Sequence, residues 1–245
     1  MTTTPNTETL DSQSVAPPAS FSPRRAARIA GVSYLVMFVL AIIANFAVIE
    51  SMFEPGDATA TLGNINDSIG MFRAGAVAFL VIAILDVAIA WALHVIFRRV
   101  DHDVSLAAAW FRLAYSAMLG VAVAHLFKVL QLVSGGLDIG ADQMATQTMS
   151  ALADFRTTWL LGLALFGVHL ALVGRLAVRS GFAPKNLGYV LIAAGVAYVV
   201  DTVARLGMSD YEAVAGVFLV VVALPSMIGE GWLGFWLLLS RRTER

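Results

Sequence analysis

The sequence contains no cysteine and few charges: Asp, Glu, Lys and Arg make up 13% of its 245 residues, whereas 59% are hydrophobic. The absence of cysteine excludes disulfides and thiolate metal sites. Soluble domains carry about 25% charged residues, so this chain has too few charges to cover a water-facing surface. The formal net charge of -1 offers no basic surplus, which excludes nucleic acid as a partner. The composition therefore predicts a membrane protein whose main partner is the lipid bilayer.

Six hydrophobic runs each reach the length of about 20 residues that a helix needs to cross a bilayer. Barrel strands are excluded because alternating segments of about 10 residues are absent. We therefore expect an all-α, polytopic membrane protein with six transmembrane helices. The runs are Ala26–Ile49, Ala74–Phe97, Val104–Ser134, Phe155–Val178, Leu187–Leu206 and Ala213–Leu239.

The chain divides into one membrane domain and two short tails. Residues 1–23 are rich in Thr, Ser, Pro and Ala and have no apolar run, so we expect a disordered N-terminal tail. The six-helix domain covers residues 24–240, and a short basic tail covers residues 241–245. The first run is too long for a secretory signal core and has no cleavage site after it, which indicates an uncleaved anchor.

Lysine and arginine gather at the two ends of the chain and at alternate connections between the runs. The positive-inside rule places these segments in the cytoplasm. Both termini are therefore predicted to be cytoplasmic, as an even number of helices requires. The basic residues are Arg24, Arg25, Arg28, Arg98, Arg99, Arg175, Arg179, Lys185, Arg241, Arg242 and Arg245.

Ionisable side chains inside the runs are the candidate functional residues. Each costs about 2.5–3.5 kcal/mol at the bilayer centre and usually faces the interior of the helix bundle. Four of them lie about eight to eleven residues from the cytoplasmic ends, or roughly 12–17 Å at the helical rise. This candidate polar network comprises Asp86, Arg112, His169 and Glu230.

A second, more basic group lies toward the outer side of the membrane. Two of its members, Asp201 and Arg205, have the i,i+4 spacing that places them on one helix face. The candidate outer polar layer comprises Arg73, Lys128, Arg156, Asp201 and Arg205.

Two interpretations of these layers remain open. In the first, Asp86, Glu230 and Arg112 form a buried ion pair or triad that fixes the register of the helices. In the second, the layers line a polar path or pocket, where carboxylates and a histidine carry protons or bind an ionic solute. Matching depth alone does not show that the residues face one another.

Metal and haem sites have less support. His169, Glu230 and Asp86 are zinc ligands by residue type, but no helix carries a His-x-x-x-His or His-Glu-x-x-His motif. His94 and His169 lie at different depths, which argues against a b-type haem. We therefore expect no metal and no other cofactor.

Several blocks of the sequence resemble a known family. They are ARIAGVSYL at Ala27–Leu35, AAAWFRLAYSAMLG around Arg112, FGVHLALVGRLAVRSGFAPKNLGYVLIAAGVAYVVDTV at Phe166–Val203, and PSMIGE at Pro225–Glu230. In this order they are similar to the uncharacterised bacterial integral membrane family catalogued as domain of unknown function 4386. The resemblance implies a six-helix bundle in the inner membrane of a bacterium, with no established substrate, reaction or cofactor. The family's recurrent polar positions match Asp86, Arg112, His169, Asp201 and Glu230.

Three functions fit this sequence. The preferred one is a carrier or channel for a small ionic solute, or a proton-coupled carrier. Asp86, Glu230 and His169 are its candidate titrating groups with Arg112 as their charge partner, and the basic outer layer would attract an anion. The first alternative is a non-catalytic structural or accessory subunit whose charges pair. The second is an intramembrane lipid-modifying enzyme that uses His169 and Glu230 as acid and base, although we lean against enzymatic activity. The sequence leaves the oligomeric state and any partner protein open.

Overall fold

The computed structural model describes residues 22–135 and 139–240. Most of the predicted N-terminal tail and the whole C-terminal tail lie outside these residues. The last two tail residues belong to the start of the first helix, because the Ser22 side chain accepts a hydrogen bond from the Arg25 amide and Pro23 occupies the first turn.

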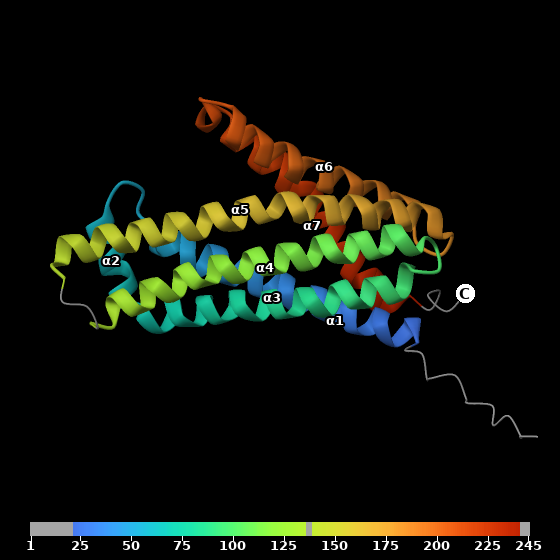
Figure 1. The fold of residues 1–245 in the computed structure, drawn as a ribbon, viewed down its shortest axis with the longest axis horizontal. Helices are drawn as coiled ribbons and strands as arrows, with labels where there is room; N and C mark the ends of the chain where they lie inside the picture. Colours follow the sequence, from blue (N-terminus) through green and yellow to red (C-terminus); the bar gives the residue numbers. More distant parts are fainter. Residues whose placement is uncertain (1–21, 136–138, 241–245) are drawn as a thin grey trace, which may run out of the picture.

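The described residues form helices and no strand, and six of the helices are long and apolar enough to cross a membrane. The predicted all-α fold with six membrane-spanning helices is therefore confirmed (Figure 1). The first span changes from an α-helix into a π-helix, η1, near its end. The spans are α1 Pro23–Ile42 with η1 Ile43–Glu50, α3 Ile69–Phe97, α4 His102–Val133, α5 Ala141–Ser180, α6 Lys185–Gly207 and α7 Ala215–Leu239.

Three features differ from the expected runs. Helix α5 begins at Ala141, well before the predicted Phe155, because its first turns are polar and lie outside the hydrophobic run. A short helix, α2 Ala58–Asp67, packs against α5, and a single 3-10 turn, η2 Tyr211–Ala213, precedes α7. Asp57 caps α2 by accepting a hydrogen bond from the Ala60 amide at 2.8 Å.

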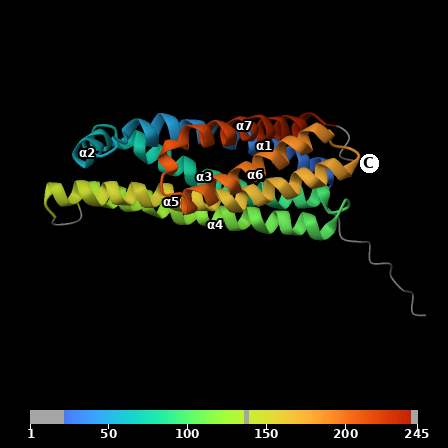
Figure 2. The ribbon, with the colours of Figure 1, turned by 90° about the horizontal axis from the view of Figure 1, so that it is seen from above.

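The spans pack in a ring in which each helix contacts the next and α7 returns to α1. Figure 2 shows α4 and α5 in one layer and α1 and α7 in the opposite one. At one end of the bundle, Gly31 of α1 lies so close to α7 that an added Cβ would be 2.8 Å from the Leu238 amide nitrogen. The start of α1 and the end of α7 therefore lie at the same end of the bundle.

Helices α5 and α6 are in backbone contact along a seam of glycines. A Cβ at Gly195 would lie 2.3 Å from the Gly167 carbonyl oxygen, and one at Gly174 would lie 2.5 Å from the Gly188 carbonyl oxygen. The hairpin between the helices turns at Gly181, whose φ of 72° favours glycine. Small residues let helices approach closely in lipid, so this pair forms a rigid side of the bundle.

Candidate functional site

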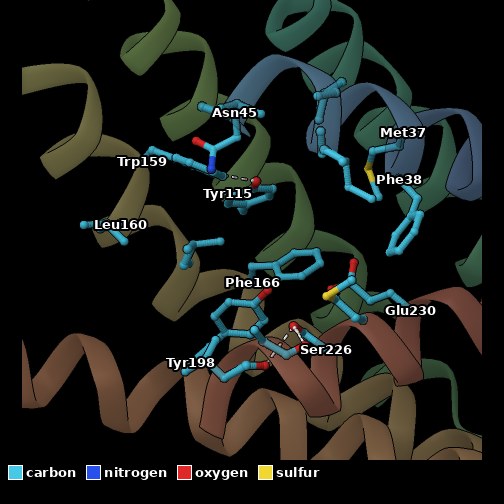
Figure 3. Close-up of a pocket in the computed structure, with 18 of the residues that line it drawn as sticks. Met37, Phe38, Asn45, Tyr115, Trp159, Leu160, Phe166, Tyr198, Ser226 and Glu230 are labelled. Atoms are coloured by element: carbon cyan, nitrogen blue, oxygen red, sulfur yellow. Dashed lines mark hydrogen bonds between the residues drawn. The ribbon is translucent and has the colours of Figure 1, made fainter. Parts of the chain in front are cut away.

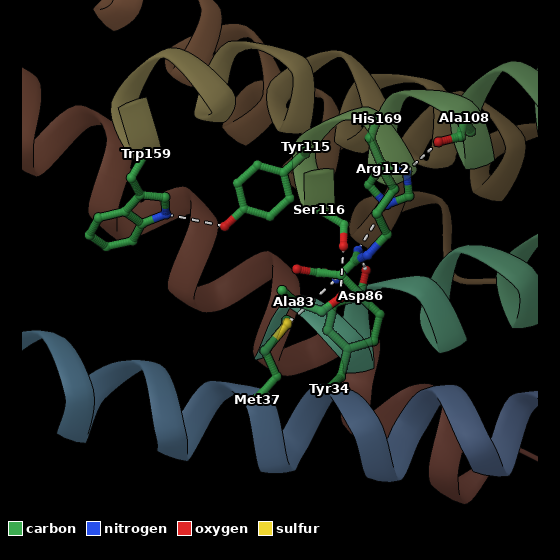
Figure 4. Close-up of polar contacts among 10 residues, drawn as sticks. All are labelled: Tyr34, Met37, Ala83, Asp86, Ala108, Arg112, Tyr115, Ser116, Trp159 and His169. Carbon is green, nitrogen blue, oxygen red and sulfur yellow. Dashed lines mark hydrogen bonds and ion pairs between the residues drawn. The ribbon is translucent and has the colours of Figure 1, made fainter. Parts of the chain in front are cut away.

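Arg112 on α4 is fully buried at the centre of the bundle. Its Nη2 lies 2.6 Å from Oδ1 of Asp86 on α3, and its Nη1 donates a hydrogen bond to the Tyr34 hydroxyl of α1 at 2.6 Å. The same Nη1 lies 3.0 Å from Nε2 of His169 on α5 (Figure 4). One arginine therefore links four of the spans. We call Arg112, Asp86, His169 and Tyr34 the Arg112 cluster.

His169 uses both of its ring nitrogens. Nδ1 lies 2.8 Å from the carbonyl oxygen of Ala108, which can only accept a hydrogen bond, so Nδ1 carries the proton. Nε2 faces the Arg112 guanidinium, which can only donate, so Nε2 is unprotonated. These partners hold His169 in one neutral tautomer.

Aromatic rings and a thioether complete the surroundings of Arg112. Its guanidinium carbon lies 4.7 Å from the centre of the Tyr34 ring and 5.2 Å from the centre of the Phe166 ring, within the range of cation–π attraction. The sulfur of Met37 lies 3.7 Å from Nη2. These contacts stabilise a buried cation whose formal charge is balanced by Asp86.

Asp86 is only partly satisfied by this pairing. Among the described residues, its Oδ2 has no hydrogen-bond partner, and neither has Nε of Arg112. Such orphaned buried atoms cost free energy. Asp86 also lines a cavity of the bundle.

The cavity has a volume of about 310 Å³ and lies between the seven helical segments α1, η1 and α3–α7 (Figure 3). It follows α7 from Phe218 to Glu230, roughly 18 Å at the helical rise. Most of its wall is apolar. The aromatic side chains that line it are Tyr34, Phe38, Phe46, Phe79, Tyr115, Trp159, Phe166, Tyr198 and Phe218.

Glu230 lies in the wall of this cavity and is partly buried. Within residues 22–135 and 139–240, no hydrogen bond or ion pair joins its carboxyl to another residue. The structure therefore brings together three of the four predicted inner residues, Asp86, Arg112 and His169. It places the fourth, Glu230, beside the cavity and outside their hydrogen-bond network.

The five residues of the predicted outer layer do not form one cluster. Arg73 and Lys128 are exposed. Arg156 pairs with Glu50, whose two carboxylate oxygens both lie 2.7 Å from its Nη2, and stacks on Phe53 at 4.4 Å. This pair ties the end of η1 to α5.

Asp201 and Arg205 form the predicted i,i+4 pair at 3.0 Å and both line the cavity. The Tyr211 hydroxyl donates a hydrogen bond to the other oxygen of Asp201 at 2.5 Å, and the Arg205 guanidinium lies over the Tyr211 ring. Burial raises the pKa of Tyr211 to about 12, and the hydrogen bond to Asp201 acts in the same direction. We call Asp201, Arg205 and Tyr211 the outer latch, because they join α6 to the segment before α7.

Sequence reasoning missed three partners of these charges, Tyr34, Glu50 and Tyr211. Tyr34 lies in a hydrophobic run but has no insertion cost comparable to that of a charge, and Tyr211 lies outside the runs, so depth counting singles out neither of them. Glu50 directly follows the first hydrophobic run, so a search for charges inside the runs does not include it. Its pairing with Arg156 spans 106 positions of the sequence and depends on the packing of η1.

No group of three His, Cys, Asp or Glu in the described parts of the chain has the arrangement of a metal site. The family described as a domain of unknown function, DUF4386, matches residues 29–240. An uncharacterised protein of Archaeoglobus fulgidus is 30% identical over 166 residues, which cover 68% of this chain and 83% of the relative. No solved structure matches. The six-helix chain with the Arg112 cluster and the adjoining cavity belongs to the domain of unknown function 4386 family.

Proposed function

We propose that this integral membrane protein is a proton-coupled carrier that binds amphipathic organic cations in the cavity beside Glu230. The observation that carries the proposal is the Glu230 carboxyl, which has no hydrogen-bond or ion-pair partner within the described residues and lies in a cavity with an aromatic wall. The distribution of Lys and Arg favours cytoplasmic termini, in the inner membrane of a bacterium.

The balance of charge around the cavity favours a cation. Asp86 and Arg112 neutralise each other, and His169 is held neutral by its two hydrogen-bond partners. An ionised Glu230 leaves one negative charge in surroundings of low polarity, where an unpaired charge is costly. A bound cation or a proton removes that cost.

The shape and chemistry of the wall favour an organic cation over an inorganic ion. A small inorganic cation needs several oxygen ligands around it, and this wall is mostly hydrocarbon and aromatic ring. Aromatic faces attract cations that have lost their water. Tyr34 and Phe166 already stabilise the Arg112 guanidinium in this way, and both rings also line the cavity.

Coupling to protons follows if cation and proton compete for one carboxyl. Binding of the cation to the neutral form of Glu230 leaves a carboxylate beside the cation and releases one proton. Return of the proton releases the cation. A carrier that exposes this carboxyl to each side in turn exchanges protons for cations.

The burial and hydrogen bonds of the Arg112 cluster favour a structural role for its members. Arg112 and His169 are fully buried, and neither lines the cavity. Both nitrogens of His169 are engaged, so it offers no free site for the acid–base work that a lipid-modifying enzyme requires. The cluster holds four spans in register, and Glu230 remains for the ligand.

Tetraphenylphosphonium is a suitable probe, because it joins one positive charge to an apolar surface. Isothermal titration of the purified protein in detergent should show binding that Glu230→Gln weakens about tenfold or more. Glu212→Gln is the matched control, because Glu212 is an exposed carboxyl on η2 that does not line the cavity. Unchanged affinity in Glu230→Gln, or no binding by the native protein, would contradict the proposal.

The released proton gives a second readout. The heat of binding should depend on the ionisation enthalpy of the buffer for the native protein and for Glu212→Gln. It should not depend on the buffer for any residual binding by Glu230→Gln, because glutamine has no proton to release. A heat of binding by the native protein that does not depend on the buffer would rule out proton coupling.

A further inference from the structure

We infer that the cavity opens sideways into the acyl-chain layer of the bilayer, through a slot between η1 and the outer half of α7. Its ligands then enter from within the membrane. The identity of these ligands as organic cations rests on the proposed function, whereas the opening rests on the structure alone.

Residues on both edges of the slot face the cavity and the outside of the bundle at once. On α1 and η1, Ile42 is 40% exposed and Phe46 is 63% exposed. On α7, Leu219 is 64% exposed and Met227 is 51% exposed. All four line the cavity. Side chains that belong both to a cavity wall and to the outer surface mark the rim of an opening, and these four side chains are all apolar.

The slot arises because the first span and α7 are in close contact at only one end. Near the chain termini, Gly31 and Gly234 let the two helices meet at backbone distance. Farther along, η1 turns to α3, where Val48 lies against Gly75. The wider π-helical turn of η1 also carries Asn45 into the cavity. The two elements therefore diverge toward the outer side.

The other end of the cavity is less favourable to such a ligand, because its exposed wall residue, Arg205, is charged. There the outer latch places the ion pair of Asp201 and Arg205 in the wall, with the buried Tyr211 hydrogen-bonded to Asp201. A molecule that enters from water at this end has to separate these groups. A molecule dissolved among the acyl chains meets only hydrocarbon at the slot.

Trp159 provides a probe inside the cavity. It lines the wall and donates a hydrogen bond to the Tyr115 hydroxyl at 3.2 Å. The experiment replaces the other four tryptophans by phenylalanine and reconstitutes the protein in phosphatidylcholine vesicles with brominated acyl chains, which quench tryptophan on contact. Trp159 emission should fall relative to unbrominated vesicles, and it should fall less with acrylamide, a quencher dissolved in water.

A pair of α7 variants tests the route. Ala223 lines the cavity and is partly buried, so Ala223→Phe fills the slot and should reduce quenching by brominated chains. Val220 is exposed on the same helix outside the cavity wall, so Val220→Phe adds the same bulk elsewhere and should leave quenching unchanged. Should the four tryptophan replacements prevent folding, the difference between the native protein and Trp159→Phe measures the same contribution.

Three results would overturn the inference. Stronger quenching by acrylamide than by brominated chains would place the entrance at the outer latch. Absence of quenching by either would show a closed cavity. Equal quenching in Ala223→Phe and Val220→Phe would show that acyl chains reach Trp159 by another route. None of these measurements needs a bound cation, so they are independent of the tetraphenylphosphonium titration.

Discussion

Asp86 and Glu230 line the same cavity, but within the part of the chain that the structure describes only Asp86 has an ion-pair partner. Asp86 lies 2.6 Å from Arg112 inside a cluster that joins four spans. Glu230 lies on α7, the span with the smallest buried share of the six, and its carboxyl makes no hydrogen bond or ion pair with the described residues. One carboxyl is used to hold the helices together, and the other is available to a ligand.

The two sides of the bundle also differ in how closely their helices pack. On the closed side, α5 and α6 touch along the Gly167–Gly195 and Gly174–Gly188 contacts, and the Arg112 cluster lies between α1, α3, α4 and α5. On the side where we infer the opening, η1 packs on α3 and α1, and the contact between α1 and α7 lies at the end of the bundle where Gly31 and Gly234 meet. In Figure 1 the α6–α7 hairpin diverges from α5 toward its tip. The bundle therefore has one closely packed side next to a less closely packed one.

The largest effect on stability is expected from replacing Arg112, which holds α1, α3, α4 and α5 together. Arg112→Met leaves Asp86 as an uncompensated buried charge, and removing one partner of a buried pair costs about 3–5 kcal/mol. The thermal unfolding midpoint of the protein in detergent should fall strongly. Arg73→Met is the control, because Arg73 is exposed, and it should change the midpoint little.

A compensating change sharpens this test. Asp86→Asn in the Arg112→Met background removes the stranded charge and should recover part of the lost stability. Equal midpoints for Arg112→Met and Arg73→Met would show that the cluster does not stabilise the bundle. So would a double variant that is no more stable than Arg112→Met.

The second largest effect on the unfolding midpoint is expected from a substitution in the glycine contacts between α5 and α6. Gly195→Ala places a methyl group 2.3 Å from the Gly167 carbonyl oxygen, a backbone atom that cannot move aside alone. Overpacking of this kind costs about 1–3 kcal/mol. Gly231→Ala is the matched control on α7, because an added Cβ there meets nothing within 4 Å, and it should be neutral or stabilising. A higher midpoint for Gly195→Ala than for Gly231→Ala would contradict the close contact.

The sequence was sufficient to predict the six spans and the shared depth of Asp86, Arg112 and His169. Length, hydropathy and the cost of intramembrane charges depend on local composition, so they can be read from one chain. The early start of α5 at Ala141 could not be read in this way. Its first turns are polar and extend the helix beyond the hydrophobic run.

The division of roles between Asp86 and Glu230 was also beyond the sequence. Depth along a helix follows from counting residues, but the direction of a side chain around the helix depends on how the neighbours pack. Arg112 faces α3 and meets Asp86, while Glu230 faces the cavity. The same reason explains why Arg156 pairs with Glu50 and does not join the other residues of the predicted outer layer.

The smallest expected effect concerns the outer latch on the open side. Tyr211→Phe removes the hydrogen bond to Asp201 and should lower the free energy of unfolding by about 1 kcal/mol. The pKa of Tyr211 is raised from 10.0 to about 12, so the fold favours the neutral phenol. The stability that Tyr211 adds is therefore complete below about pH 10 and is lost as the pH rises toward 12. The gap between the unfolding midpoints of the native protein and Tyr211→Phe should stay constant up to about pH 10 and then shrink. A gap that is unchanged at pH 11, or that widens, would show that Tyr211 does not hold α6 to the start of α7 through its neutral hydroxyl.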